Sequence, residues 1–159
     1  MTYISSPRPA VLFVCLGNIC RSPLAEGAFR AAALRAGLDV HVDSAGTADW
    51  HHGKAPDPRA IRTAARHGVD ISGLRARQVV AEDFHRFTHV FALDHDNLAG
   101  LRARVPAGAP TAPGLFLDLV EGRAGQPVAD PYYGDEAGFE QTWADVTAGA
   151  DALVRLLGR

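Results

Sequence analysis

Short apolar segments alternate along the chain with longer segments whose apolar residues recur every three or four positions. The first short segment, residues 10–14, is continuously apolar and rich in branched residues, which is typical of a strand buried on both faces. Further strands are predicted at 40–43, 88–93 and near 115–117. The alternation predicts a doubly wound α/β fold, with a parallel sheet of about four strands and helices on both faces.

Proline, glycine and capping residues mark the expected ends of the helices. Ser22 is predicted to cap the first helix with Pro23 at its first position, and Gly37 to end that helix. Asp57 and Pro58 predict the start of a second helix by the same rule. An apolar stripe at helical spacing over residues 139–157 predicts a long last helix.

The composition fits one domain over residues 10–159, preceded by a loose N-terminal arm over residues 1–9. The chain has 159 residues, of which 47% are hydrophobic and 21% charged. A formal net charge of −2 gives no electrostatic footprint for nucleic acid or an anionic membrane. The two cysteines provide no disulfide framework, so a cytoplasmic location is expected.

The loop after the first strand carries the most informative chemistry. It opens with Cys15 and closes with Arg21, before a predicted helix N-terminus. Backbone N–H groups at such a position bind anions, and a thiol placed there ionises more readily than a free one. An arginine fork can hold two phosphate oxygens. We therefore expect Cys15 to attack a phosphorus atom and form a cysteinyl phosphate. The residues between them would shape the phosphate site: Leu16, Gly17, Asn18, Ile19 and Cys20.

Residues 14–23 (VCLGNICRSP) resemble the signature of the low-molecular-weight protein tyrosine phosphatases. The resemblance continues at residues 43–47, 56–60, 77–79, 94–98 and 130–134, so it covers nearly all of the chain after residue 10. It implies the same fold and a hydrolase of phosphotyrosine that uses no metal or cofactor. It also implies that Asp130 is the general acid and that the Ser22 hydroxyl bonds the Cys15 sulfur.

Aromatic side chains are predicted to line the substrate site, and a second thiol is predicted to protect it from oxidation. Trp50 and Tyr132, with Leu16, are expected to line a slot for a flat substrate ring. Whether Tyr132 or Tyr133 is itself phosphorylated, as in some relatives, is open. Cys20 is expected to capture oxidised Cys15 as a disulfide, the alternative being that it only packs against the sheet.

Three other functions compete with phosphotyrosine hydrolysis. A thiol-dependent arsenate reductase would need further cysteines, and the sequence has none after Cys20. Arginine phosphatases resemble this loop but carry threonine where this chain has Ile19. A binding module with a dead site is disfavoured by the intact trio Cys15, Arg21 and Asp130. The expected partners are phosphotyrosine proteins, with a cognate tyrosine kinase as a further candidate, and neither nucleic acid nor a membrane.

Overall fold

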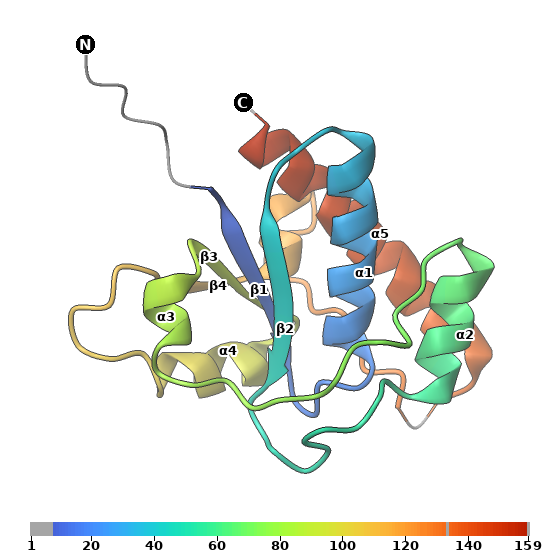
Figure 1. Cartoon of the computed structure of the whole chain (residues 1–159), viewed down its shortest axis with the longest axis horizontal. Coiled ribbons are helices and arrows are strands. Elements are labelled where there is room, and N and C mark those ends of the chain that lie inside the picture. The colour runs from blue at the N-terminus through green and yellow to red at the C-terminus, as the bar shows by residue number, and fades with distance from the viewer. Residues whose placement is uncertain (1–7, 133, 159) are drawn as a thin grey trace.

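Within residues 8–132 and 134–158, which the computed structural model describes, four parallel strands form one sheet in the order β2–β1–β3–β4 (Figure 1). The strands are β1 (Ala10–Cys15), β2 (His41–Gly46), β3 (His89–Ala92) and β4 (Pro113–Leu115). The prediction of a parallel sheet of about four strands is therefore confirmed.

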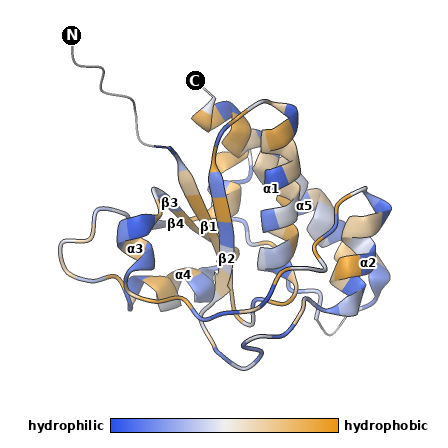
Figure 2. Ribbon diagram, viewed as in Figure 1, coloured by the Kyte–Doolittle hydropathy of each residue, from blue (hydrophilic) through white to orange (hydrophobic). Residues whose placement is uncertain are grey.

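The first strand is apolar along its whole length because both of its faces are covered. Val11 and Phe13 belong to the hydrophobic core beneath one layer of helices, whereas Leu12 and Val14 belong to the core on the opposite face. All four side chains are fully buried. In Figure 2 this strand is correspondingly hydrophobic along its length.

Helices lie on both faces of the sheet, as the alternation predicts (Figure 1). One face carries α1 (Arg21–Arg35), α2 (Pro58–Arg66) and α5 (Glu136–Leu157). The other face carries α3 (Asp83–Arg86) and α4 (His95–Arg102). None of the described helices is long and apolar enough to cross a bilayer.

Two local predictions are wrong. The first helix begins at Arg21 with Cys20 at its N-cap, so Ser22 lies inside the first turn and caps nothing. The Ser22 hydroxyl is turned instead toward Cys15 and Asn18. The last strand, predicted near residues 115–117, ends at Leu115, and the chain then enters a 3₁₀ turn, η1 (Phe116–Leu119).

The turn at η1 has a packing cause. Phe116 is fully buried against α5 at Gly149, where a Cβ atom would lie 2.5 Å from the Phe116 ring. The apolar residues at 116 and 117 are therefore buried from a 3₁₀ turn and not from a strand, which their residue types alone do not distinguish.

The carboxyl ends of the strands gather the loops at one edge of the sheet (Figure 1). Cys15 at the end of β1 pairs in register with Gly46 at the end of β2, and β3 ends beside them at Ala92.

Most of the predicted N-terminal arm, residues 1–7, lies outside the described residues. Arg8, which belongs to the same predicted arm, forms an ion pair with Asp39 at 2.9 Å.

Candidate active site

The loop between β1 and α1, called here the phosphate loop (residues 15–21), is fixed from below by Asn18. Its backbone has a φ of 59°, a left-handed conformation that asparagine tolerates better than most residues. Its side-chain amide donates to Ser22 Oγ at 2.8 Å and to Ser44 Oγ at 3.0 Å. Its carbonyl accepts from the Arg77 backbone N–H at 3.0 Å. The buried Asn18 therefore supports the loop and does not line the cavity above it.

Two branches of hydrogen bonds leave the Asn18 amide beneath the loop, one toward Glu26 and one toward Cys15. Ser44 donates to the Glu26 carboxylate at 2.8 Å, so its oxygen is free to accept from Asn18. Asn18 in turn donates to Ser22 Oγ, which lies 3.0 Å from Cys15 Sγ. Since Ser22 Oγ accepts from Asn18, its own proton can be donated to the Cys15 sulfur.

Glu26, at the far end of this chain of hydrogen bonds, is buried. Burial raises the pKa of Glu26, while the hydrogen bonds from Ser44 and Arg30 oppose that effect. Arg30 approaches one carboxylate oxygen at 2.6 Å and Ser44 the other at 2.8 Å. With both oxygens accepting, the carboxylate orients the Ser44 hydroxyl, so that Ser44 Oγ accepts from Asn18.

Arg21 lies in the first turn of α1 and is buried, with 3% of its side chain exposed. Its Nη1 donates to Asp94 Oδ2 at 2.7 Å and to the Val128 carbonyl at 2.9 Å, and its Nη2 lies 3.5 Å from Asp130 Oδ2. Burial opposes the charge, but Cys15, Asp94 and Asp130 outweigh it and raise the pKa of Arg21 further. The guanidinium is therefore a permanent cation in a fixed orientation.

Asp94 is a site residue that sequence reasoning missed. One carboxylate oxygen holds Arg21, and the other accepts from the Asn97 N–H at 2.7 Å as the N-cap of α4. The sequence offered a partial signal, since an aspartate between an apolar strand and a helix is typical of an N-cap. Its contact with Arg21 joins two residues that are 73 positions apart, so no local sequence pattern indicates it.

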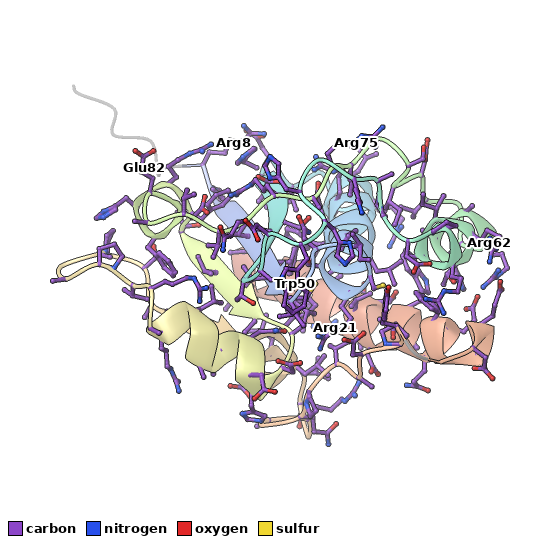
Figure 3. The ribbon with its side chains drawn as sticks, turned by 90° about the horizontal axis from the view of Figure 1, so that it is seen from below. Arg8, Arg21, Trp50, Arg62, Arg75 and Glu82 are labelled. Carbon is purple, nitrogen blue, oxygen red and sulfur yellow. The ribbon has the colours of Figure 1, made fainter. Side chains whose placement is uncertain are left out.

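A cavity of about 230 Å³ opens above the phosphate loop. The structure brings most of the predicted site residues to it: Cys15, Leu16, Gly17, Ile19, Cys20, Arg21, Trp50, Asp130 and Tyr132. Figure 3 shows Arg21 and Trp50 beside one another at this edge of the molecule. Trp50, Tyr132 and Leu16 remain partly exposed around the cavity, so their apolar surfaces are available to a ligand.

His51 also lines the cavity, although no sequence pattern separates it from its neighbour His52. Its ring packs over Gly17, where a Cβ atom would lie 2.9 Å from His51 Cδ2. Glycine at position 17 thus leaves room for the His51 ring, which a larger residue would displace.

Cys20 is a buried thiol on the cavity wall. Burial raises its pKa strongly, and the nearby charges of Asp57, Cys15 and Asp130 act in the same direction. Cys20 therefore favours its neutral thiol form. Both cysteines are free thiols.

Asp130 lies in the segment that precedes α5, called here the Asp130 loop (residues 129–132, 134 and 135). Its side chain is 45% exposed at the mouth of the cavity. One oxygen accepts from the Tyr132 N–H at 3.0 Å, and the other faces Arg21. Tyr133 lies outside the described residues. Among the described residues, no cluster of three or more His, Cys, Asp or Glu side chains is arranged to hold a metal ion.

Comparisons with known proteins agree with this geometry. The family model described as low molecular weight phosphotyrosine protein phosphatase matches residues 10–159. Low molecular weight phosphotyrosine protein phosphatase 2 of Drosophila melanogaster is 44% identical over 142 residues, which cover 87% of this chain and 85% of that protein.

Solved structures have the same fold. The crystal structure of YfkJ from Bacillus subtilis aligns with a TM-score of 0.89 at 35% identity and covers 96% of both chains. A drosophila arginine phosphatase aligns with a TM-score of 0.86 at 28% identity, covering 92% of this chain and 96% of its own. Since the family model spans nearly the whole chain and the relatives match over most of their length, the chain belongs to the low molecular weight phosphotyrosine protein phosphatase family.

Proposed function

We propose that this phosphatase hydrolyses phosphotyrosine in two steps at the cavity above the phosphate loop. In the first, the Cys15 thiolate attacks phosphorus while Asp130 gives its proton to the departing phenolic oxygen. In the second, the Asp130 carboxylate accepts a proton from water as that water attacks the cysteinyl phosphate. Inorganic phosphate leaves, and the thiolate is regenerated.

The convergence of Cys15, Arg21 and Asp130 on one cavity carries this proposal. Arg21 is held in place by Asp94 and Val128, so its guanidinium needs no reorganisation to meet the charge of the transferring group. The N-terminus of α1 adds its positive end at the same point. A cation and backbone donors thus supply the stabilisation that a metal would give elsewhere.

The substrate is an aryl phosphate on a protein. Trp50 and Tyr132 offer flat apolar walls, and Ile19 on the cavity wall adds an apolar surface. A phenolic ring gains from these surfaces, whereas the cationic guanidino group of a phosphoarginine would lose hydration there. The partners are therefore phosphotyrosine proteins, with a cognate tyrosine kinase upstream. Two free thiols in the site suit the reducing cytoplasm as the working compartment.

Cys20 protects the site from oxidation in this proposal. Peroxide converts the Cys15 thiolate to a sulfenic acid, and the Cys20 thiol displaces water from it to form a disulfide. Both side chains line the same cavity, and the negative charge of Cys15 contributes to the raised pKa of Cys20. Because Cys20 is protonated, the capture is slow unless the proton leaves as the sulfur attacks.

The test of this protection compares wild type with Cys20→Ser after peroxide treatment. Dithiothreitol should restore wild-type activity almost fully and the variant poorly, because only wild type holds the oxidised sulfur as a reducible disulfide. Equal recovery of the two proteins would show that Cys20 only packs.

The hydrolytic mechanism is tested by trapping the intermediate. Rapid acid quench of wild type with an aryl phosphate should leave one phosphate group on the peptide that contains Cys15. Cys15→Ser should show no such group and no turnover, while it still binds inorganic phosphate. Turnover by Cys15→Ser at the wild-type rate would refute the mechanism.

A further inference from the structure

Arg59 reaches from the first turn of α2 to the Asp130 loop. Its Nη2 donates to the Tyr132 carbonyl at 2.8 Å, and its Nη1 donates to the Gly134 carbonyl at 3.1 Å. The guanidinium also lies over the Phe139 ring of α5, 4.8 Å from its centroid. These contacts join the loop and the start of α5 to one side chain.

The Arg59 side chain is itself held by Asp57. The Asp57 carboxylate accepts from Arg59 Nε at 3.1 Å and from Nη2 at 2.9 Å, and these hydrogen bonds lower the pKa of Asp57. Asp57 also caps α2 by accepting from the Arg59 N–H at 2.8 Å. Bidentate contact of this kind fixes the plane of a guanidinium.

The same short segment is attached to the phosphate loop. The Asp57 N–H donates to the Ile19 carbonyl at 2.8 Å. Arg59 and its neighbour Asp57 therefore connect the Asp130 loop to the phosphate loop. In the proposed mechanism the substrate binds on the phosphate loop.

The contact on Tyr132 reaches Asp130 through one residue. Arg59 holds the Tyr132 carbonyl, and the Tyr132 N–H donates to Asp130 Oδ1 at 3.0 Å. The Tyr132 N–H and carbonyl belong to two planar peptide units that are joined by the φ and ψ of Tyr132, and sterics allow only limited ranges of these angles. A carbonyl held by Arg59 therefore limits the directions in which the Tyr132 N–H can point. The Asp130 carboxylate is 45% exposed and has few buried contacts to orient it, so this restriction matters.

We propose that Arg59 is a positioning residue for Asp130, which holds the carboxyl group at the distance from the phosphate loop that proton transfer requires. The inference rests on the proposed function of Asp130 as the general acid. Proton transfer needs a heavy-atom separation near that of a hydrogen bond, so a small displacement of the acid is costly.

The leaving group provides the test, because only poor leaving groups depend on a well-placed acid. For Arg59→Met we expect kcat/KM to fall about 10-fold with phenyl phosphate and less than about twofold with 4-nitrophenyl phosphate. The plot of log kcat/KM against leaving-group pKa should steepen accordingly. A purely structural loss would lower both rates equally and would overturn the proposal.

Arg62→Met is the matched control. Arg62 also joins α2 to α5, through Glu136 at 3.0 Å, but makes its contact on the outer part of α2, away from Arg21 and Trp50 (Figure 3). We expect Arg62→Met to leave the slope unchanged. A slope as steep as that of Arg59→Met would show that any loosening of α2 suffices, and the specific role of Arg59 would be refuted.

A double variant separates this inference from the one on which it rests. If Arg59 acts through Asp130, then Arg59→Met in the Asp130→Ala background should add no further leaving-group dependence. If Asp130→Ala itself leaves the slope unchanged, the acid role of Asp130 fails. If Asp130→Ala steepens the slope and Arg59→Met does not, only the role of Arg59 fails.

Arg59→Lys keeps the test decisive if Arg59→Met folds poorly. Lysine retains a cation near Phe139 but cannot bind Asp57 and two carbonyls together. We expect a slope between those of wild type and Asp130→Ala. A wild-type slope in a folded Arg59→Lys would show that a single charge is enough and that the bidentate geometry has no role.

Discussion

The phosphate loop and the Asp130 loop serve one cavity but are built differently. The phosphate loop is supported by buried polar side chains that hydrogen-bond one another. Asn18 and Ser22 are at the centre of this network. The Asp130 loop lies at the surface, and its carboxylate is 45% exposed. The first is fixed before substrate arrives, whereas the second is held by a few contacts at its edge. In the proposed mechanism, binding of phosphate and transfer of a proton therefore depend on different parts of the protein.

The largest effect should come from Arg21→Lys in the fixed region. Lysine keeps the charge but cannot donate to Asp94, Val128 and two phosphate oxygens with one planar group. We expect kcat/KM to fall about 1000-fold, by a similar factor for good and poor leaving groups. Steady-state kinetics with several aryl phosphates measure this. A loss confined to poor leaving groups would mean that Arg21 acts through Asp130.

Asp130→Ala should have the next largest effect, and a selective one. Without the acid we expect kcat/KM to fall about 100-fold with phenyl phosphate and by less than about threefold with 4-nitrophenyl phosphate. The free energy of unfolding should change by less than about 0.5 kcal/mol, because the side chain is on the surface. Denaturant unfolding checks the second statement, and equal rate losses would contradict the first.

Asn18→Ala tests whether the fixed loop is also a stabilising element. The substitution removes three hydrogen bonds and leaves the Arg77 N–H without a partner and Ser44 Oγ with Glu26 as its remaining side-chain partner, so the free energy of unfolding should fall by about 3 kcal/mol. The rate should fall about 10-fold through the altered loop.

Asn18→Gly is the matched control for backbone strain. Glycine accepts the φ of 59° and loses the same hydrogen bonds, so it should be more stable than Asn18→Ala by about 1 kcal/mol. Equal stability of the two variants would mean that the left-handed conformation costs nothing at this position.

The smallest effect concerns the ion pairs between α2 and α5, outside both loops. Hydrogen bonds from His67 and Arg66 lower the pKa of Glu140. Its stabilising contribution is therefore fully present above the ordinary glutamate pKa and is lost as the pH falls through the lower folded value. We expect Glu140→Gln to lower Tm by about 2 °C at pH 7 and less at low pH. Glu82→Gln serves as a control, and a difference that is independent of pH would contradict this assignment.

The sequence predicted the elements whose signals are local. The buried first strand, the Asp57 cap with Pro58 behind it and the order of strands and helices are confirmed. Ser22 misled because its residue type suits a cap, while its hydroxyl is bonded to Cys15 and Asn18 and the helix starts earlier. A side chain with two suitable partners cannot be assigned from propensity alone.

The supporting residues of the site were beyond a sequence argument. Ser44, Asp94 and Arg59 reach their partners across 26, 73 and 73 residues of chain, respectively. Only the register of the sheet and the packing of α2 on α5 bring these pairs together. The residues around the cavity could be predicted, because parallel strands deliver their loops to one edge. The residues that hold them depend on three-dimensional contacts.

Through its two carboxylate oxygens, Asp94 links Arg21 at the cavity to a backbone amide at the start of α4. Binding in the cavity should therefore affect hydrogen exchange in α4. One oxygen holds Arg21 and the other holds the Asn97 N–H, so opening the first turn of α4 releases the guanidinium as well. A bound phosphate stabilises the closed arrangement, and by reciprocity it must slow that opening. Inorganic phosphate should therefore slow hydrogen exchange at Asn97 on the opposite face of the sheet from α1.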